Sequence, residues 1–300
     1  MIGVLNINKP IRKSSHDVVQ AVRRIMDIRR VGHTGTLDPL ATGVLVILVG
    51  PATRLTQFIV GADKAYHAVI RLGVTTTTYD EEGEITSRAP ASIMDNVDRA
   101  AIEAALSAFE GEIAQAPPMY SAVRVQGRRL YELAREGQDV ERAPRSVTIY
   151  QLEIASYEPP DLTLDLRCSS GTYVRSLAHD LGQTLGCGAY LRALTRTAVG
   201  PFRLEESYTL DQLHALAQEQ RLDEALHPPR AALYDMPSVQ LTPAQERAVR
   251  YGQSIALPPT PERVEASHLQ AEDAEGRLVA VLIPVEEGRW RPTLVLPEHD

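Results

Sequence analysis

A carboxylate stands on a loop that the sequence itself makes stiff. Residues 32–43 read Gly-His-Thr-Gly-Thr-Leu-Asp-Pro-Leu-Ala-Thr-Gly and directly precede an apolar run at 44–49. Three glycines permit a backbone path that side chains would forbid, and Pro39 pushes Asp38 towards extended geometry. A carboxylate aimed in this way can stabilise or capture positive charge at a reacting carbon, as in glycoside cleavage. The alternative is an ordinary Asp-Pro turn before a buried strand.

Two further side chains are candidates to work with Asp38. Tyr66 lies in the alternating segment 64–73, which predicts a strand, and by itself this position is typical of a half-buried aromatic. Arg175 falls in the first turn of a predicted helix, where a positive charge opposes the macrodipole and favours a carboxylate partner.

These strings resemble the motifs of the TruB family of pseudouridine synthases, which isomerise uridine 55 of tRNA and are related to guide-dependent enzymes of the dyskerin type. The resemblance rests on the loop 32–43, on Lys-Ala-Tyr at 64–66 followed by Arg-Leu-Gly at 71–73, and on Cys-Ser-Ser-Gly-Thr-Tyr-Val-Arg at 168–175. It implies that Asp38 is the catalytic residue and that Arg175 pairs with it. Because an apolar pocket disfavours an ionised carboxylate, a bidentate Arg175 would offset that penalty and aim Asp38. Tyr66 would line the uracil pocket, Leu194 would pack against the target base, and Tyr173 would support the site.

The resemblance also implies residues that bind or support folded RNA. His33 would take up the space left by the flipped base, with a surface histidine bonded to its own loop as the alternative. RNA-binding roles also fall on Lys64 and on Asp80, which we expect at the edge of the site. Lys9 and Pro10 would belong to a structural motif that supports the catalytic loop.

Residues 115–145 resemble the thumb-like insertion of the stand-alone tRNA enzymes. This segment would be a mobile basic arm that closes over an RNA hairpin through Arg124, Arg128 and Arg129, or else an ordinary surface hairpin and helix. The guide-dependent relatives share its start but not the continuation Gly-x-x-Leu-Tyr-Glu-x-Ala-x-x-Gly at 127–137. That continuation favours a stand-alone enzyme.

Periodicity and capping signals predict the elements that must hold these residues. Ser14 and Asp17 are spaced as a capping pair at the start of a helix that runs to residue 27. Further helices are predicted over 52–60, 95–109 and 209–218, and another opens with Thr172 as its N-cap. Strands are predicted over 3–8, 44–49, 64–73, 148–157, 162–168 and 189–199.

The resemblance implies an α+β fold in two parts. Residues 1–235 would form the pseudouridine synthase catalytic domain, with a central, mostly antiparallel mixed sheet flanked by helices. Prolines at 228, 229 and 237 mark a boundary, and residues 236–300 would form a small β-rich, PUA-like RNA-binding domain. Strand-like runs occur there at 254–257, 278–284 and 293–296. Because every residue assigned to chemistry precedes this tail, we expect the tail to affect tRNA affinity and not the chemical step.

The net charge of −8 is unevenly distributed along the chain. Residues 205–300 hold 8 Arg against 17 Asp and Glu, whereas residues 1–204 carry a net charge of +1. Residues 9–36 hold seven basic and two acidic side chains, and residues 121–145 hold six and four. A basic face on an acidic chain is compatible with binding RNA through its phosphates.

Composition argues against several classes of protein. No stretch approaches the roughly 18 apolar residues of a membrane span, and residues 1–10 lack the order of a signal peptide. Cys168 and Cys187 are too few for a disulfide framework or a structural zinc site. No phosphate-cradling fingerprint is present, and isomerisation adds and removes nothing, so we expect no cofactor. We expect a cytoplasmic monomer that acts on the tRNA T-arm stem-loop without a membrane or a protein partner. An RNA-binding tRNA-folding chaperone and a guide-dependent synthase remain as alternatives.

Overall fold

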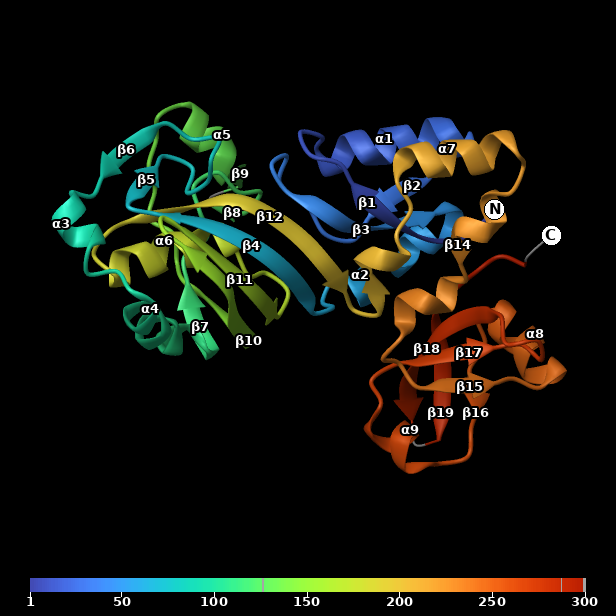
Figure 1. Ribbon diagram of the computed structural model, residues 1–300. Coiled ribbons are helices and arrows are strands. Elements are labelled where there is room, and N and C mark those ends of the chain that lie inside the picture. Colours follow the sequence, from blue (N-terminus) through green and yellow to red (C-terminus); the bar gives the residue numbers. More distant parts are fainter. Residues whose placement is uncertain (126, 287, 299–300) are drawn as a thin grey trace.

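The computed structural model of the chain describes residues 1–125, 127–286 and 288–298. Its largest feature is a ten-stranded sheet with the order β14-β1-β3-β12-β4-β11-β10-β7, to which β2 adds on β3 and β13 on β12 (Figure 1). In this part of the chain the pairings are antiparallel except for β3 with β12, which is parallel. The strands are β1 (Gly3–Lys9), β2 (Val31–His33), β3 (Thr42–Val49), β4 (Lys64–Leu72), β7 (Gly111–Gln115), β10 (Arg145–Glu158), β11 (Asp161–Cys168), β12 (Ala189–Val199), β13 (Phe202–Arg203) and β14 (Leu226–His227).

Helices cover each half of this sheet. Helices α1 (Ser15–Met26) and α7 (Leu210–Gln218) lie side by side over β1 and β3, and α4 (Arg99–Leu106) and α6 (Val174–Thr184) pack on the half built from β4, β10, β11 and β12 (Figure 1). The alternating apolar side chains of β4 point into the hydrophobic core between the sheet and helices α4 and α6, as the sequence predicts. No helix in the described ranges is long and apolar enough to cross a membrane.

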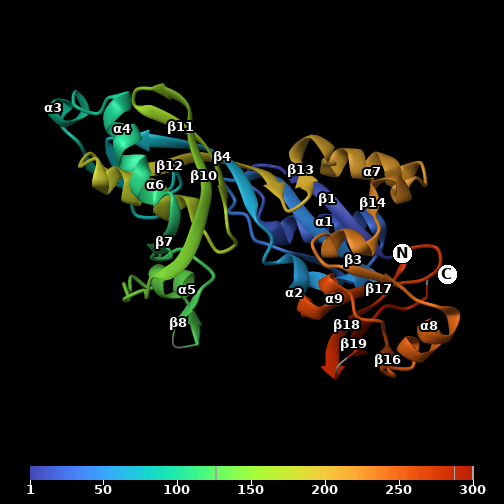
Figure 2. The same ribbon diagram turned by 90° about the horizontal axis from the view of Figure 1, so that it is seen from below.

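Short segments connect these elements. A hairpin of β8 (Arg124–Val125) and β9 (Arg128–Arg129) leads into α5 (Leu130–Arg135), and together they project from the sheet (Figure 2). These three elements are called the thumb below. The other connecting segments are η1 (Gly50–Leu55), α2 (Thr56–Ile59), β5 (Val74–Thr76), β6 (Ile85–Arg88), α3 (Ala91–Met94), η2 (Ser107–Phe109), η3 (Leu204–Glu206), η4 (Leu222–Ala225) and η5 (Pro229–Leu233).

The C-terminal residues form a separate five-stranded sheet with the order β15-β17-β18-β19-β16. Its elements are β15 (Ser238–Gln240), α8 (Pro243–Arg250), β16 (Ile255–Ala256), α9 (Pro261–Glu265), β17 (Leu269–Glu272), β18 (Leu278–Glu286) and β19 (Arg289–Val295). The architecture therefore confirms an α+β fold with a large mixed sheet and a β-rich C-terminal sheet.

The two sheets share a hydrophobic core. Strand β3 is buried on both faces: Leu45, Ile47 and Val49 pack with α1, whereas Val44, Val46 and Leu48 pack with leucines and valines of β18 and β19. The guanidinium of Arg54 also donates a hydrogen bond to the Val295 carbonyl at 2.7 Å. The C-terminal sheet is therefore packed against the face of β1 and β3 opposite to α1 and α7 (Figure 1).

Element boundaries differ from the sequence prediction in several places: the helix predicted over 52–60 is η1 followed by α2, and β10 is longer than the strand predicted over 148–157. The helix expected from residue 95 begins at Arg99, because the Asp98 carboxylate caps it by accepting from the Ala101 N–H. The N-cap of α6 is Tyr173 and not Thr172, whose hydroxyl instead donates to the Ser169 carbonyl. In the tail, β15, β17, α8 and α9 were not predicted, although the Thr242–Gln245 capping box and Pro243 at the first helical position were a readable signal for α8.

Candidate active site

Hydrogen bonds from the first residue of α1 and the last residue of β1 hold the loop that carries Asp38. The Ser15 hydroxyl accepts from the Leu37 N–H at 2.8 Å and lies 3.1 Å from the Leu37 carbonyl, so the first residue of α1 holds the peptide next to Asp38. The buried ammonium of Lys9 donates to the carbonyls of Pro10, Lys13 and Pro39 at 3.0, 2.6 and 3.4 Å. Lys9 and Pro10 therefore lie behind the loop, where the sequence placed a supporting motif.

Glycine is required where this loop enters β3. Gly43 has a φ of +99°, and a Cβ there would lie 2.2 Å from the Arg196 carbonyl of the parallel neighbour β12. The close approach of the two backbones brings the catalytic loop against β12, which also carries Leu194.

Arg175 lies between two carboxylates. Its Nε is 3.0 Å from Asp38 Oδ2, and its Nη1 is 3.3 Å from Asp80 Oδ2. The Arg175 and Asp80 side chains are 5% and 4% exposed, whereas Asp38 is 36% exposed and faces the open side. The predicted pairing of Arg175 with Asp38 is present as an ion pair, but the guanidinium is divided between two carboxylates and is not bidentate to Asp38.

The remaining donors of Arg175 reach two other segments. Nη1 donates to the Thr78 carbonyl at 3.3 Å and Nη2 to the Tyr120 carbonyl at 2.9 Å, at the base of the thumb. Four parts of the chain therefore meet at one guanidinium: the loop that carries Asp38, the turn 78–80, the segment around Tyr120 and α6.

Asp80 lies deeper than the sequence analysis expected. Burial raises the pKa of the Asp80 carboxyl, while the Thr78 hydroxyl and the Arg175 charge act in the opposite direction. Burial and the neighbouring Asp80 and Asp38 charges likewise raise the pKa of Glu82. Asp80 is thus a buried partner of Arg175 rather than a group at the rim.

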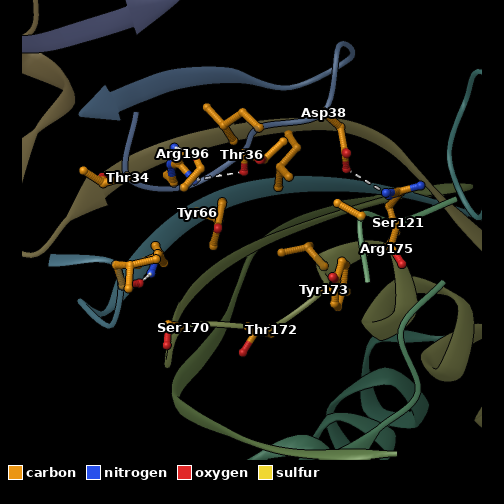
Figure 3. A pocket seen from close by; sticks show the side chains of 18 of the residues that line it. Thr34, Thr36, Asp38, Tyr66, Ser121, Ser170, Thr172, Tyr173, Arg175 and Arg196 are labelled. Atoms are coloured by element: carbon orange, nitrogen blue, oxygen red, sulfur yellow. Dashed lines mark hydrogen bonds and ion pairs between the residues drawn. The ribbon is translucent and has the colours of Figure 1, made fainter. Parts of the chain in front are cut away.

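A cavity of about 410 Å³ opens beside this ion pair (Figure 3). Asp38, Arg175 and Tyr173 stand on one side of it, and Tyr66 and Arg196 on the other (Figure 3). Leu194 and Lys64 also line it. Burial raises the pKa of Tyr66, and the nearby Arg196 charge opposes that shift, so the hydroxyl stays protonated at neutral pH. The cavity combines apolar walls with a few fixed polar groups, as small-ligand sites do.

A second cavity of about 420 Å³ shares Asp38 and Arg175 with the first and opens towards the thumb. His33, Asp80 and Arg129 line it, together with Tyr131 and Arg135 of α5. Burial lowers the pKa of His33, which favours the neutral imidazole. The Asp38–Arg175 ion pair therefore lies between the first cavity and the second cavity, which is lined by side chains of the thumb.

Some residues predicted to contact RNA are already engaged within the protein. The Lys64 ammonium is buried and donates to the carbonyls of Val60 and Ala62 at 3.0 and 2.6 Å. Arg128 pairs with Glu136 at 2.5 Å, and Arg129 donates to the Tyr131 hydroxyl at 2.9 Å. Arg124 is exposed on the hairpin and lines neither cavity. Lys64 thus lies in the pocket lining, whereas Arg124 and Arg128 lie out on the thumb.

Sequence reasoning missed Arg196 and Gln115. Arg196 is buried, and its guanidinium donates to the carbonyls of Val44, Gly35 and Thr36 at 2.7, 3.1 and 3.5 Å. The alternation of the predicted strand 189–199 was a usable signal, because it places Arg196 on the same face as Leu194. The Gln115 amide pairs with both backbone groups of Tyr173, accepting from the N–H at 2.7 Å and donating to the carbonyl at 3.1 Å. Nothing in the local pattern around Gln115 indicates this contact. Within the described ranges no group of three or more His, Cys, Asp or Glu side chains is arranged to hold a metal ion.

Comparison with known proteins gives consistent matches. Residues 23–174 match the family model described as "TruB family pseudouridylate synthase (N terminal domain)", and residues 175–234 match "tRNA pseudouridylate synthase B C-terminal domain". The chain is 43% identical over 293 residues to tRNA pseudouridine synthase B of Pseudomonas aeruginosa strain UCBPP-PA14, covering 97% of this chain and 94% of the relative. It is 46% identical over 282 residues to the protein of that name from Burkholderia pseudomallei strain 668, covering 93% and 92%.

Two solved structures share the fold over nearly the whole chain. One is a chain of an H/ACA RNP bound to a substrate RNA containing 2′-deoxyuridine, with a TM-score of 0.74 and 25% identity, covering 98% of this chain and 85% of that one. The other is a chain of a Cbf5-Nop10-Gar1 complex, with a TM-score of 0.74 and 28% identity, covering 99% and 84%.

Proposed function

Because the chain belongs to the TruB family of pseudouridylate synthases and is a tRNA pseudouridine synthase, an isomerase, we propose that it converts uridine 55 in the T-arm loop of tRNA to pseudouridine. The observation that carries the proposal is the ion pair of Asp38 with Arg175 at the edge of a cavity that Tyr66 and Leu194 also line. A single carboxylate is thereby aimed into a space of the size a nucleoside requires.

In this proposal Asp38 is the catalytic residue. The reaction breaks the N1–C1′ bond of uridine, turns the uracil and joins C5 to C1′, after which the proton on C5 leaves and N1 gains one. Charge develops at C1′, and a carboxylate can stabilise or capture it. Arg175 keeps Asp38 ionised and aimed, and Tyr173 and Leu194 shape the walls around the base. Tyr66 orients the base from the other side of the cavity.

The target base has to leave the stacked RNA before it can enter this cavity. Flipping a nucleotide out costs a few kcal/mol. His33 lines the second cavity next to Asp38 and is neutral, so it can occupy the vacated position without placing a charge in the base stack. The thumb hairpin with Arg124, Arg128 and Arg129 would hold the surrounding RNA backbone.

The separate C-terminal sheet favours the domain assignment made from the sequence, although it shares a hydrophobic core with the large sheet. We assign residues 1–235 to the catalytic domain, with the thumb insertion at about 115–145, and residues 236–300 to a PUA-like domain. A stand-alone enzyme is favoured over a guide-dependent one, because the relatives at 43% and 46% identity are tRNA pseudouridine synthases B whereas the RNP proteins are 25–28% identical.

A turnover assay with one purified chain tests the proposal. The substrate is an unmodified tRNA T-arm hairpin, and the product is measured as pseudouridine after nuclease digestion. We expect conversion at position 55 without any other protein, guide RNA or cofactor. Binding without conversion would indicate an RNA chaperone, and conversion only after addition of a guide RNA and partner proteins would indicate the guide-dependent class.

A further inference from the structure

The floor of the base cavity holds two buried cations, Lys64 and Arg196, which are 8% and 2% exposed. Both donate to backbone carbonyls: Lys64 to Val60 and Ala62, and Arg196 to Val44, Gly35 and Thr36. Over the ranges that the structure describes, neither forms an ion pair with a carboxylate. The nearest acidic neighbour in sequence, Asp63, pairs instead with Arg167 at 2.9 Å.

A buried positive charge without a counter-ion is costly. Carbonyl oxygens satisfy the N–H donors but do not neutralise the charge. Burial, reinforced by the Arg196 charge, lowers the pKa of Lys64 to about 8, which means that the folded chain disfavours the charged form of this side chain. The third cation of the cavity, Arg175, differs because it faces both Asp38 and Asp80. Lys64 and Arg196 therefore leave the cavity with an excess of positive charge opposite the catalytic carboxylate.

The register of the sheet directs both cations at the same place. Arg196 of β12 is the direct partner of Tyr66 on β4, and Lys64 precedes Tyr66 by two residues on the same face of β4. Figure 3 shows Arg196 beside Tyr66 and away from Asp38 and Arg175. Both side chains are almost fully buried, so only a group that enters the cavity can reach them. The group that can reach them is the base itself.

We propose that Lys64 and Arg196 form an anion-stabilising floor that binds the detached uracil while it carries negative charge. The inference rests on the proposed isomerisation. In a route through C1′, an Asp38 oxygen bonds to C1′ while the N1–C1′ bond breaks, and its electron pair stays on the uracil. The uracil is then a monoanion, with charge shared by N1 and the two carbonyl oxygens. C5 next bonds to C1′, the carboxylate leaves with its electron pair, and the C5 proton is transferred so that N1 becomes protonated.

The same charge appears in a route that gives a glycal. There Asp38 removes a sugar proton, the C1′–C2′ double bond forms, and the uracil again departs with the N1–C1′ electron pair. Fixed cations in a cavity that excludes water stabilise such an anion without reorganising. They also hold the free uracil in the cavity while it rotates, because the apolar walls offer the negatively charged base no comparable attraction.

The test compares two hairpins, one with uridine and one with 5-fluorouridine at the target position. Fluorine withdraws electrons, so the detached base carries its charge more easily and needs less help from the protein. The measurement is the single-turnover loss of the N-glycoside at saturating enzyme, followed by digestion and chromatography. We expect Lys64→Met to slow the uridine substrate about 100-fold and the 5-fluorouridine substrate by less than about 10-fold. Arg196→Met should behave alike, and Arg196→Lys should recover most of the rate.

Lys9→Met is the matched control. It also removes a buried ammonium bound to loop carbonyls, but Lys9 does not line the base cavity. Its loss should be the same factor on both hairpins, as for any variant that only displaces the loop. Equal losses on the two substrates for Lys64→Met and Arg196→Met would overturn the inference.

The variants also separate a folding defect from a chemical one. Arg196 holds Gly35 and Thr36 of the catalytic loop, so Arg196→Met can unfold the site, which its melting temperature reports. Lys64 donates to Val60 and Ala62, which lie outside that loop. If Arg196→Met is unfolded, the comparison of the two hairpins with Lys64→Met tests the inference by itself. If the wild-type chain fails to convert the uridine hairpin at all, the proposed function falls and the inference with it. That result is distinct from equal losses in an active enzyme.

Discussion

At the scale of single residues, the site depends on how one guanidinium is shared. Arg175 contacts Asp38 and Asp80 at 3.0 and 3.3 Å and donates to two carbonyls as well. One guanidinium neutralises only one of the two carboxylates, so the cluster keeps a net negative charge. Asp38 is the more exposed of the two and is therefore the carboxylate that a substrate can contact. The geometry therefore keeps Asp80 as a partner of Arg175 and leaves Asp38 available for the reaction.

We expect Asp38→Asn to abolish isomerisation while RNA binding changes little. Asparagine keeps the shape of the side chain but loses the negative charge that the chemistry at C1′ requires. The rate is measured in single turnover on the T-arm hairpin and the affinity by filter binding. Asp165→Asn is the control, because Asp165 is exposed and pairs with His67 away from both cavities. Turnover of Asp38→Asn within tenfold of wild type would leave the carboxylate only about 1.4 kcal/mol to supply and would contradict its assignment.

Lys9 gives a pH-dependent prediction about stability. Burial lowers the pKa of Lys9 from 10.5 to about 8 in the folded chain, whereas the unfolded chain keeps the ordinary value. Below pH 8 both states are protonated, and the penalty for burying the charge is present in full. Between about pH 8 and pH 10.5 the unfolded state binds more protons, so the contribution of Lys9 to the free energy of unfolding rises with pH.

The measurement is urea unfolding of the wild type and of Lys9→Met at several pH values from 7 to about 10. The variant lacks the titrating amine, so all other groups cancel in the difference between the two proteins. That difference should shift in favour of the wild type as the pH rises, with a slope of up to about 1.4 kcal/mol per pH unit. A difference that stays constant with pH would show that Lys9 titrates normally in the folded chain.

At the scale of elements, the thumb is joined to the ion pair at its base. The Tyr120 carbonyl accepts from Arg175, and the side chains of Arg129, Tyr131 and Arg135 line the same cavity as Asp38. The base of the thumb and Arg175 are therefore connected by a direct hydrogen bond. Arg128 is exposed and bound to Glu136, and because water screens an exposed ion pair and leaves it weak, a phosphate can replace that carboxylate.

We expect Arg128→Ala combined with Arg129→Ala to flatten the salt dependence of RNA binding. Each phosphate contact that is lost reduces the slope of log affinity against log salt by about one unit, so the double variant should lose about one to two units. The slope is measured by titrating the T-arm hairpin at several salt concentrations. Arg221→Ala is the control, since Arg221 is likewise exposed and paired with carboxylates, Glu219 and Glu224, but lies on another surface. An unchanged slope in the double variant would place the thumb off the RNA.

The sequence predicted elements well where local chemistry decides them. The Ser14–Asp17 capping box and the alternation of β4 are local, and the structure confirms both. The strand predicted over 189–199 has the bounds of β12. Prediction failed where a distant contact decides the outcome. Thr172 does not cap α6, because its hydroxyl donates to the Ser169 carbonyl, and the peptide of the actual N-cap, Tyr173, is bound by the Gln115 amide 58 residues away.

The same distinction applies to the site. Asp38, Tyr66, Arg175 and Leu194 were found through short motifs, and the structure brings all four to one cavity. Arg196 belongs to no motif that was considered, and its importance follows from its register opposite Tyr66 and from carbonyls more than 150 residues away in sequence. The sharing of Arg175 with Asp80 was missed for a similar reason, since only the folded turn brings residues 78–80 to α6.

At the scale of the whole molecule, the boundary near residue 235 separates two sheets but not two cores. The face of β3 opposite to α1 packs in one cluster with four tail residues, Leu278, Val281, Leu294 and Leu296. The Gln270 amide adds hydrogen bonds to the carbonyls of Leu233 and Met236, at 3.2 and 2.6 Å. The tail therefore covers apolar surface of the strand that follows the catalytic loop, and the expectation that it affects affinity alone does not fit this packing.

We now expect truncation after Asp235 to lower the melting temperature and to slow the chemical step at saturating hairpin. Burying one large aliphatic side chain contributes about 1.5–3 kcal/mol, so the four tail residues of the shared core account for roughly 6 kcal/mol or more. For a chain of this size that corresponds to a fall of about 10 °C or more. The loss falls on β3, whose first residues adjoin the loop that aims Asp38, so the rate should fall together with the stability. A chain ending at Leu296 keeps every tail side chain of the shared core and should match the full-length protein. If the protein truncated after Asp235 melts like the wild type and reacts at the same single-turnover rate, the tail is an independent module, and its contacts matter only for the affinity of full-length tRNA.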